Sequence, residues 1–161
     1  MKEAMVNIKL NMPPCSLQTR TTQGECPTTE IFDIVRRKWV ANTPEEWVRQ
    51  HVVHTLIYQM KYPLELIQIE GSITLNRMNR RCDIVIYNQE AKPVLIVECK
   101  RPNVSLTQKV IDQICRYNLV LQVPYLYLTN GLQHLILRAD LQQQQLHQLP
   151  TLPDWDILNN N

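Results

Sequence analysis

Hydrophobic and polar residues alternate along several short segments in the second half of the chain. Between residues 67 and 75, apolar side chains stand at positions 67, 69, 73 and 75, which is typical of a β-strand with one buried face. Residues 82–87 and 93–99 predict a second and a third strand, and the uniformly apolar third one is expected to be central in the sheet. Residues 125–129 and 134–138 predict two more strands, separated by an Asn130-Gly131 turn.

Two other segments have the residue spacing of amphipathic helices. Thr43-Pro44-Glu45-Glu46 combines an N-cap residue, a proline suited to the first helical position and a glutamate that can complete a capping box. The helix that begins there has apolar residues at positions 48, 52, 56 and 60 and is expected to end before Pro63. A second helix is expected over residues 105–121, between the third and fourth strands.

The order of these elements predicts an α/β (α+β) domain with a mixed sheet of about five strands flanked by helices. The first three strands can form an antiparallel meander, and the second helix is long enough to cross over to a parallel fourth strand. We expect this domain to cover residues 30–140. An extended arm over residues 1–29 would precede it, and a polar tail over residues 141–161 would follow it.

Composition narrows the class of protein. The chain has 161 residues, 44% of them hydrophobic and 20% charged, which suits a single globular domain. No apolar run is long enough to cross a bilayer, so we expect no membrane partner. The five cysteines are irregularly spaced without a Cys-x-x-Cys pair, which indicates free thiols in the cytoplasm and no structural zinc.

Three side chains of the predicted sheet are suited to metal-dependent chemistry. Glu98 and Lys100 are two residues apart on the third strand and share a face, and a hairpin would bring Asp83 beside them. Because Mg²⁺ and Mn²⁺ prefer oxygen ligands, Asp83 and Glu98 form the expected metal site. Lys100 would orient or deprotonate a metal-bound water. A solvated strand end with a modest ion pair, or a buried ion-pair cluster, is the structural alternative.

A glutamate of the first helix is expected to join this site. Glu45 is preferred because it lies in line with the apolar residues 48, 52 and 56, whereas Glu46 is well placed to close the capping box. Glu70, on the polar face of the first strand, is a third candidate. Plain surface charge is the alternative for all three.

Five segments combine these features in one order, and they cover residues 43–50, 81–87, 95–102, 113–117 and 127–131. Together they resemble the N-terminal nuclease domain of type I restriction enzyme restriction subunits, in its short stand-alone form. The resemblance implies a restriction-endonuclease-like core of the PD-(D/E)xK superfamily, with Asp83, Glu98 and Lys100 as catalytic residues. It also implies a Gln-x-x-x-Tyr motif, matched by Gln113 and Tyr117. Cys82 stands where the superfamily name has proline.

The resemblance implies a Mg²⁺-dependent DNA endonuclease that hydrolyses phosphodiester bonds in a restriction-modification system. Restriction subunits of this type also carry an ATP-driven translocase, but this sequence has three glycines and no Gly-x-x-x-x-Gly-Lys loop, so we expect no ATP binding. A non-catalytic DNA- or partner-binding module that keeps the nuclease fold is the alternative. DNA is the expected partner, through Arg80, Arg81, Arg101 and Tyr117.

The net charge of +2 is low for a DNA-binding domain. We therefore expect weak DNA binding by the isolated chain, helped by self-association or by another defence-system subunit. Gln113 and Tyr117 are four residues apart and share a helical face. We expect this face to be turned toward the sheet, so that the Gln113 amide bonds near Lys100 and Tyr117 supports it. A solvent-facing Gln113 with Tyr117 in the core is the alternative.

Overall fold

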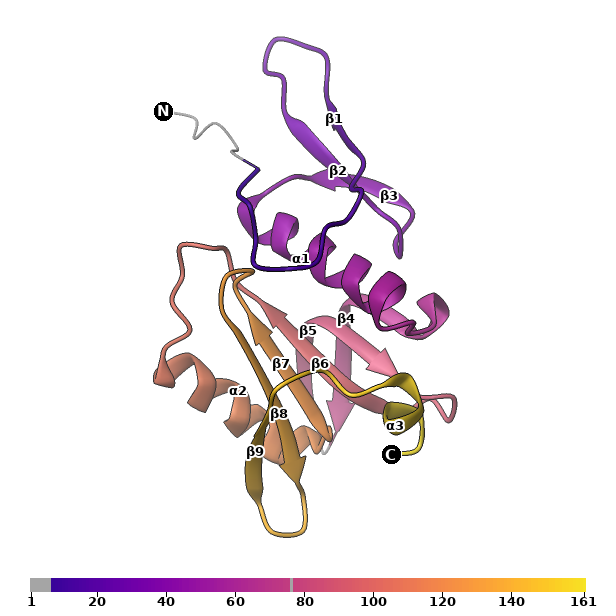
Figure 1. Cartoon of the computed structure of the whole chain (residues 1–161), viewed down its shortest axis with the longest axis vertical. Coiled ribbons are helices and arrows are strands. Elements are labelled where there is room, and N and C mark those ends of the chain that lie inside the picture. Colours follow the sequence, from indigo (N-terminus) through magenta and orange to yellow (C-terminus); the bar gives the residue numbers. More distant parts are fainter. Residues whose placement is uncertain (1–6, 76) are drawn as a thin grey trace.

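The computed structural model describes residues 7–75 and 77–161, except the side chains of Leu75 and Met78. It has the expected α/β (α+β) architecture, with helices around a mixed sheet, and a smaller sheet stands beyond α1 (Figure 1). None of the described helices is both long and apolar enough to cross a membrane. The elements are β1 (Thr19–Thr21), β2 (Thr29–Asp33), β3 (Lys38–Ala41), α1 (Pro44–His54), η1 (Thr55–Gln59), η2 (Leu64–Leu66), β4 (Ile67–Leu75), β5 (Met78–Tyr87), β6 (Pro93–Cys99), α2 (Gln108–Leu121), β7 (Tyr125–Thr129), β8 (His134–Asp140), β9 (Gln145–Leu149) and α3 (Trp155–Asn159).

The larger sheet has the strand order β4-β5-β6-β7-β8-β9. Its first three strands form the expected antiparallel meander. The helix α2 crosses over to β7, which pairs with β6 in parallel, with Leu95 opposite Tyr125. Two further antiparallel strands complete the sheet. The sequence prediction for β4 to β8 is confirmed, and β9 is a strand that it missed.

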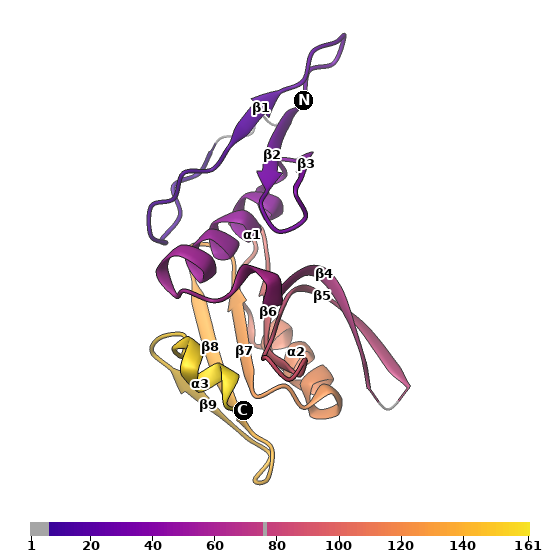
Figure 2. The ribbon, with the colours of Figure 1, turned by 90° about the vertical axis from the view of Figure 1, so that its right-hand side faces the viewer.

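Helices cover both faces of this sheet (Figure 2). From Leu95 onward, successive residues of β6 alternate between the two cores: Leu95 and Val97 lie in the core with α1, and Ile96 lies in the core with α2. Both faces of β6 are therefore buried, which explains its uniformly apolar sequence. The α1 core includes Val48, Val52, Leu56, Ile84 and Ile86, and the α2 core includes Ile114, Leu121, Val85 and Leu126.

The start of α1 follows the sequence prediction only in part. Thr43 Oγ1 accepts a hydrogen bond from the backbone N–H of Glu46 at 3.1 Å, and Pro44 opens the helix. The expected capping box is nevertheless incomplete. The Glu46 carboxylate binds arginine side chains, and the Thr43 N–H donates to the carbonyl of Ala41. Competition from charged partners removes Glu46 from its capping position, because charge-assisted hydrogen bonds are the stronger ones.

The two ends of the chain hold more structure than the sequence predicted. Within the expected arm, Leu10 is buried and the Asn11 N–H donates to the Gly131 carbonyl at 2.8 Å. The expected polar tail contains β9 and α3, whose Leu158 is fully buried. The pattern missed β9 because an exposed edge strand rich in glutamine shows little hydrophobic contrast. Residues 1–6 of the expected arm, and Asn76 between β4 and β5, lie outside the described residues.

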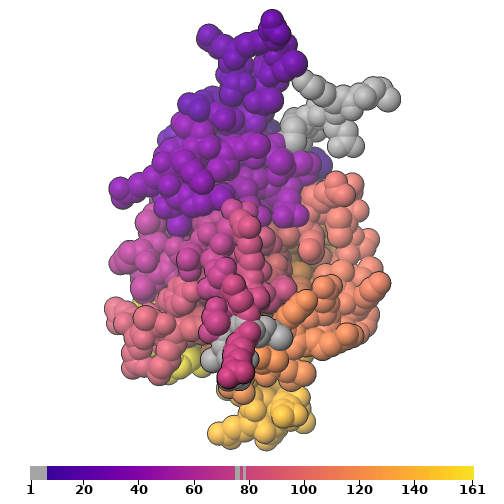
Figure 3. Space-filling model, turned by 180° about the vertical axis from the view of Figure 1, so that it is seen from behind, coloured from indigo at the N-terminus to yellow at the C-terminus, as the bar shows by residue number. Residues whose placement is uncertain are grey.

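The β4–β5 hairpin changes face at Glu70. Glu70 has a φ of 51°, in the left-handed region that is strained for a residue with a side chain. On one side of it, Ile69 and Ile84 pair and face the α1 core, while Ile73 and Cys82 on the other side lie in the α2 core. The rest of the hairpin therefore runs toward α2, where it forms a ridge on the molecule (Figure 3).

Gly131, in the turn between β7 and β8, offers a test of how the N-terminal segment is fastened. Its φ is 84°, and a Cβ there would lie 2.7 Å from Leu10 Cδ2 and 3.1 Å from Val48 Cγ2. We expect Gly131→Ala to lower the free energy of unfolding by about 1–3 kcal/mol, because left-handed strain and crowding add. Urea denaturation measures this. Leu132→Ala, at the exposed neighbouring position, is the control and should cost less than about 0.5 kcal/mol. Equal effects would contradict the interpretation.

Candidate active site

The pairing of β5 with β6 brings together the two carboxylates expected to bind metal. Ile84 lies opposite Val97 in this antiparallel pair. Continuing the register by one residue puts Asp83 opposite Glu98. Asp83 and Glu98 also lie at the bend of the β4–β5 hairpin, where β5 stops pairing with β6. The geometry expected from the sequence is thus present, while the catalytic role of these residues stays a prediction.

Both oxygens of Asp83 have hydrogen-bond donors. Oδ2 accepts from the backbone N–H of Cys99 at 2.7 Å, and Oδ1 accepts from Arg49 Nη2 at 3.1 Å. One donor belongs to β6 and the other to α1, so the carboxylate is fixed from two elements. Its orientation depends on both of them.

Glu98 is more deeply buried than Asp83, with 10% of its side chain exposed. Burial and the adjacent charge of Asp83 raise the pKa of Glu98 to about 7, although Arg80 acts in the opposite direction. Arg80 Nη2 donates to Glu98 Oε1 at 2.9 Å. Two close carboxylates in a buried place repel each other, and a cation between them would relieve that repulsion.

The donor set fits a hard divalent cation. Mg²⁺ takes one or two protein carboxylates and completes its shell with waters or phosphate oxygens. Asp83 and Glu98 supply two such groups. Among the described residues, no group of three or more His, Cys, Asp or Glu side chains is placed to hold a metal ion. The remaining ligands of a cation at this pair would therefore come from solvent or substrate.

Glu45 lies close to Asp83, and Lys100 follows Glu98 just beyond the end of β6. The backbone N–H of Lys100 donates to the carbonyl of Thr129 at 2.8 Å, which fixes the chain where β6 ends. Burial raises the pKa of Glu45; the charge of Asp83 acts in the same direction, and the charges of Arg49 and Lys100 oppose it. These influences support the choice of Glu45 over Glu46 for the site.

The structure adds Arg49, to which the sequence analysis gave no role. Only 7% of its side chain is exposed, and it donates to Asp83, to Glu46 at 2.5 Å and to Glu45 at 3.4 Å. Glu45 and Arg49 are four residues apart in α1, and this spacing of opposite charges is the one signal in the sequence that could have indicated it. The contact of Arg49 with Asp83 of β5 leaves no periodic pattern in the sequence.

Glu46 and Glu70, the other two glutamates considered for the site, bind arginines instead. Glu46 is buried and accepts from Arg36, Arg49 and Gln50. Glu70 forms ion pairs with Arg36 and Arg81, each at 3.0 Å. Both glutamates thus belong to a charged network beside the Asp83–Glu98 pair.

Tyr117 and Gln113 take different positions on α2. The guanidinium of Arg80 lies over the Tyr117 ring, 4.1 Å from its centroid, so Tyr117 supports the arginine that binds Glu98. Gln113 is exposed and makes no hydrogen bond among the described residues. The expectation that Gln113 faces the sheet is therefore wrong. Its amide can bond to water and needs no partner in the site.

The expected DNA-binding residues are only partly free to meet DNA. Arg81, with 69% of its side chain exposed, and Arg101 are at the surface. Arg80 is 20% exposed and is engaged between Glu98 and Tyr117. Next to them, Lys109, Gln113, Arg116 and Tyr117 line an open pocket on α2 with a volume of about 560 Å³.

Comparison with known proteins gives a family and one related structure. Residues 44–153 match the family described as type I restriction enzyme R protein N terminus. The fragment structure of a putative HsdR subunit of a type I restriction enzyme from Vibrio vulnificus YJ016 is 27% identical in sequence. That match covers 58% of this chain and 18% of that chain, with a TM-score of 0.37. A search among curated proteins gave no match.

The pKa of Glu98 predicts a pH dependence of stability in the absence of metal. It is raised from 4.5 to about 7 on folding, so folding favours the protonated form. The protonated Glu98 side chain therefore favours the folded state. Its contribution to the free energy of unfolding is complete below about pH 4.5 and is lost as the pH rises through about 7. Relative to Glu98→Gln, we expect the free energy of unfolding of the wild type to fall by about 3 kcal/mol between these limits. Urea denaturation with EDTA across pH is the measurement, and a constant difference would contradict the assignment.

Proposed function

The chain belongs to the family of type I restriction enzyme R protein N-terminal domains, and from this premise we propose that it is a metal-dependent deoxyribonuclease domain. The family is part of a restriction enzyme, so the coarse function is nuclease-related. The matched region spans about a fifth of the related HsdR fragment, and the finer activity is therefore our proposal. The observation that carries it is the pairing of half-buried Asp83 with buried Glu98, with Lys100 two residues beyond Glu98.

In this proposal, Asp83 and Glu98 hold Mg²⁺ or Mn²⁺. The bound cation supplies charge stabilisation for the scissile phosphate and lowers the pKa of a water. Lys100 orients that water and stabilises the extra negative charge that the phosphate gains during hydrolysis. Glu45 would add negative charge near Asp83 without being a direct ligand of the cation. Arg49 and Cys99 hold Asp83 in place, through the guanidinium and the backbone N–H respectively.

DNA would approach over the β4–β5 hairpin and α2. Arg81 is exposed on the hairpin, Arg101 is exposed in the segment between β6 and α2, and Lys109 and Arg116 line the pocket next to Tyr117. Such residues neutralise phosphates and position a duplex without reading its sequence. Gln113 lines the same pocket, where its side chain is exposed to solvent. With a net charge of +2, useful affinity would require a second copy or another subunit of a restriction system.

A non-catalytic DNA- or partner-binding module is the second candidate. The observation in its favour is that an arginine already binds each carboxylate, Arg49 on Asp83 and Arg80 on Glu98. A cation would have to compete with these guanidinium groups. A cleavage assay on plasmid and single-stranded DNA decides between the candidates, because only the nuclease hydrolyses DNA.

The principal prediction concerns the three proposed catalytic residues. We expect Asp83→Ala, Glu98→Ala and Lys100→Ala each to reduce metal-dependent cleavage of plasmid DNA by about 100-fold or more, with the fold retained. The two carboxylate variants should also weaken Mn²⁺ binding, whereas Lys100→Ala should spare it. Lys92→Ala is the matched control, since Lys92 pairs with Glu90 at the surface. Full activity in any of the three would show that the site is misassigned.

A further prediction concerns Tyr117. Tyr117→Ala removes the ring beneath Arg80, and we expect cleavage to fall by about tenfold as Arg80 loses its position on Glu98. Tyr117→Phe keeps the ring and should have a milder effect. Leu119→Ala, at an exposed position of the same helix, is the control. Similar rates for Tyr117→Ala and the wild type would remove Tyr117 from the site.

A further inference from the structure

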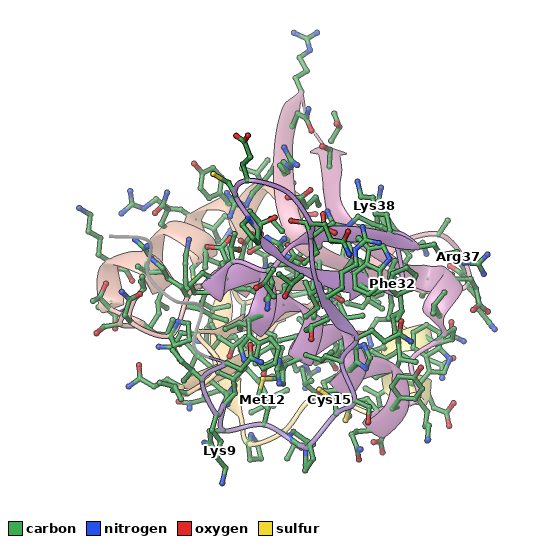
Figure 4. The ribbon with its side chains drawn as sticks, turned by 90° about the horizontal axis from the view of Figure 1, so that it is seen from above. Lys9, Met12, Cys15, Phe32, Arg37 and Lys38 are labelled. Carbon is green, nitrogen blue, oxygen red and sulfur yellow. The ribbon has the colours of Figure 1, made fainter. Side chains whose placement is uncertain are left out.

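The turn between β2 and β3 is built around a fully buried aspartate. Asp33 Oδ1 accepts from the backbone N–H groups of Val35 and Arg36, each at 2.9 Å. Its other oxygen accepts from Arg36 Nε at 2.5 Å. Asp33 therefore fixes the turn and the Arg36 side chain together. The next two residues, Arg37 and Lys38, are exposed and lie near Phe32 in this N-terminal part of the molecule (Figure 4).

Arg36 joins three elements through three nitrogens. Besides Asp33 of β2, it donates from Nη2 to Glu46 of α1 at 3.1 Å and from Nη1 to Glu70 of β4 at 3.0 Å. Only 17% of its side chain is exposed. The planar guanidinium suits this arrangement, because its donors point in fixed, separate directions.

Glu46 connects Arg36 to Arg49. Glu46 Oε1 accepts from Arg36 and from Gln50 Nε2, the latter at 2.8 Å, and Oε2 accepts from Arg49 Nη1 at 2.5 Å. The carboxylate is buried, so these bonds are weakly screened by solvent. Arg36 therefore holds the Glu46 carboxylate in place, and Glu46 in turn positions the Arg49 guanidinium.

Arg49 lies among four carboxylates, those of Glu45, Glu46, Glu70 and Asp83. It bonds to Asp83 at 3.1 Å and to Glu46, and Glu70 lies 3.9 Å from its Nη1. Arg36 provides positive charge to both Glu46 and Glu70. Without Arg36, these two carboxylates would attract Arg49 more strongly and draw it away from Asp83.

We propose that Arg36 is a positioning residue for the candidate site, acting on Asp83 through Glu46 and Arg49. The functional meaning rests on the proposed nuclease activity, in which Asp83 holds the metal. The inference assigns a task to the sheet β1–β3, which lies outside the family match at residues 44–153. This sheet supports the nuclease site through one arginine of its β2–β3 turn.

The first test needs no metal and uses the Cys99 N–H as a reporter of Asp83. This amide donates to Asp83 Oδ2, so its hydrogen exchange accelerates when Asp83 loses its position. We expect Arg36→Met to accelerate exchange of the Cys99 amide by about fivefold or more, with the Val97 amide as the measure of global stability. Lys38→Met removes the same charge from an exposed neighbour and should have no effect. Equal acceleration at Val97 and Cys99, or none at Cys99, overturns the proposal.

The second test measures Mn²⁺ binding in a double-mutant cycle. Loss of a nearby positive charge by itself strengthens the binding of a cation. Weaker Mn²⁺ binding by Arg36→Met, about threefold or more, therefore reports lost geometry. In the Arg49→Met background only the charge effect of Arg36 remains, so the same change should leave the affinity unchanged or strengthen it. Stronger or unchanged binding by Arg36→Met, or an equal loss in both backgrounds, overturns the relay.

The two experiments distinguish failure of the proposed nuclease function from failure of the proposed role of Arg36. If the wild-type chain binds no Mn²⁺, the proposed function fails, and the exchange experiment still decides whether Arg36 positions Asp83. If Arg36→Met does not fold, Arg36→Lys replaces it. Lysine keeps the charge but cannot reach three carboxylates in separate directions, so Cys99 exchange should still be faster than in the wild type, with Val97 as the reference. Exchange at the wild-type rate in this variant overturns the proposal.

Discussion

The repulsion between two carboxylates on neighbouring strands governs the polar structure of this domain. The pairing of β5 with β6 brings Asp83 and Glu98 together. The repulsion between the two side chains alone cannot prevent this pairing. The surroundings offset the repulsion with a backbone N–H from Cys99 and with one arginine from each side, Arg49 and Arg80. Glu98 still has a raised pKa, so the compensation is incomplete. An incompletely compensated pair of this kind is what a site for a cation requires.

The two arginines are held in different ways. Arg49 is buried in a network of carboxylates that extends through Glu46 to Arg36 and the small sheet. Arg80 is more exposed and rests on the aromatic face of Tyr117. A cation–π contact of this sort is worth less than several buried charge-assisted hydrogen bonds. Asp83 is thus the fixed member of the pair, and the partner of Glu98 is the more easily displaced one.

Local signals in the sequence were enough to predict most of the fold. The apolar run of β6, the alternation in β4 and the cap at Thr43 each report a local preference, and their order determines the sheet topology. The Glu98-x-Lys100 spacing similarly predicted that Glu98 lies beside Asp83 near the end of β6, while the catalytic role of these residues stays a prediction. By contrast, Arg36 and Arg49 act through ion pairs between distant segments, which leave no periodic pattern. The prediction for Gln113 was wrong because the side-chain direction turns by about 100° with each residue of an α-helix. A residue one position away from the sheet-facing side can therefore point to solvent.

The burial of two cysteines beside the site affects how the thiols react. Cys82 and Cys99 adjoin Asp83 and Glu98 in the sequence but point into the apolar cores on either side of the sheet. Burial and the neighbouring carboxylates raise the pKa of Cys82 to about 12, and they raise the pKa of Cys99 as well. Because the thiolate is the reactive form, both sulfurs are poor nucleophiles at neutral pH. Alkylating reagents and oxidants will therefore reach the exposed Cys26 first and spare the residues that frame the carboxylates.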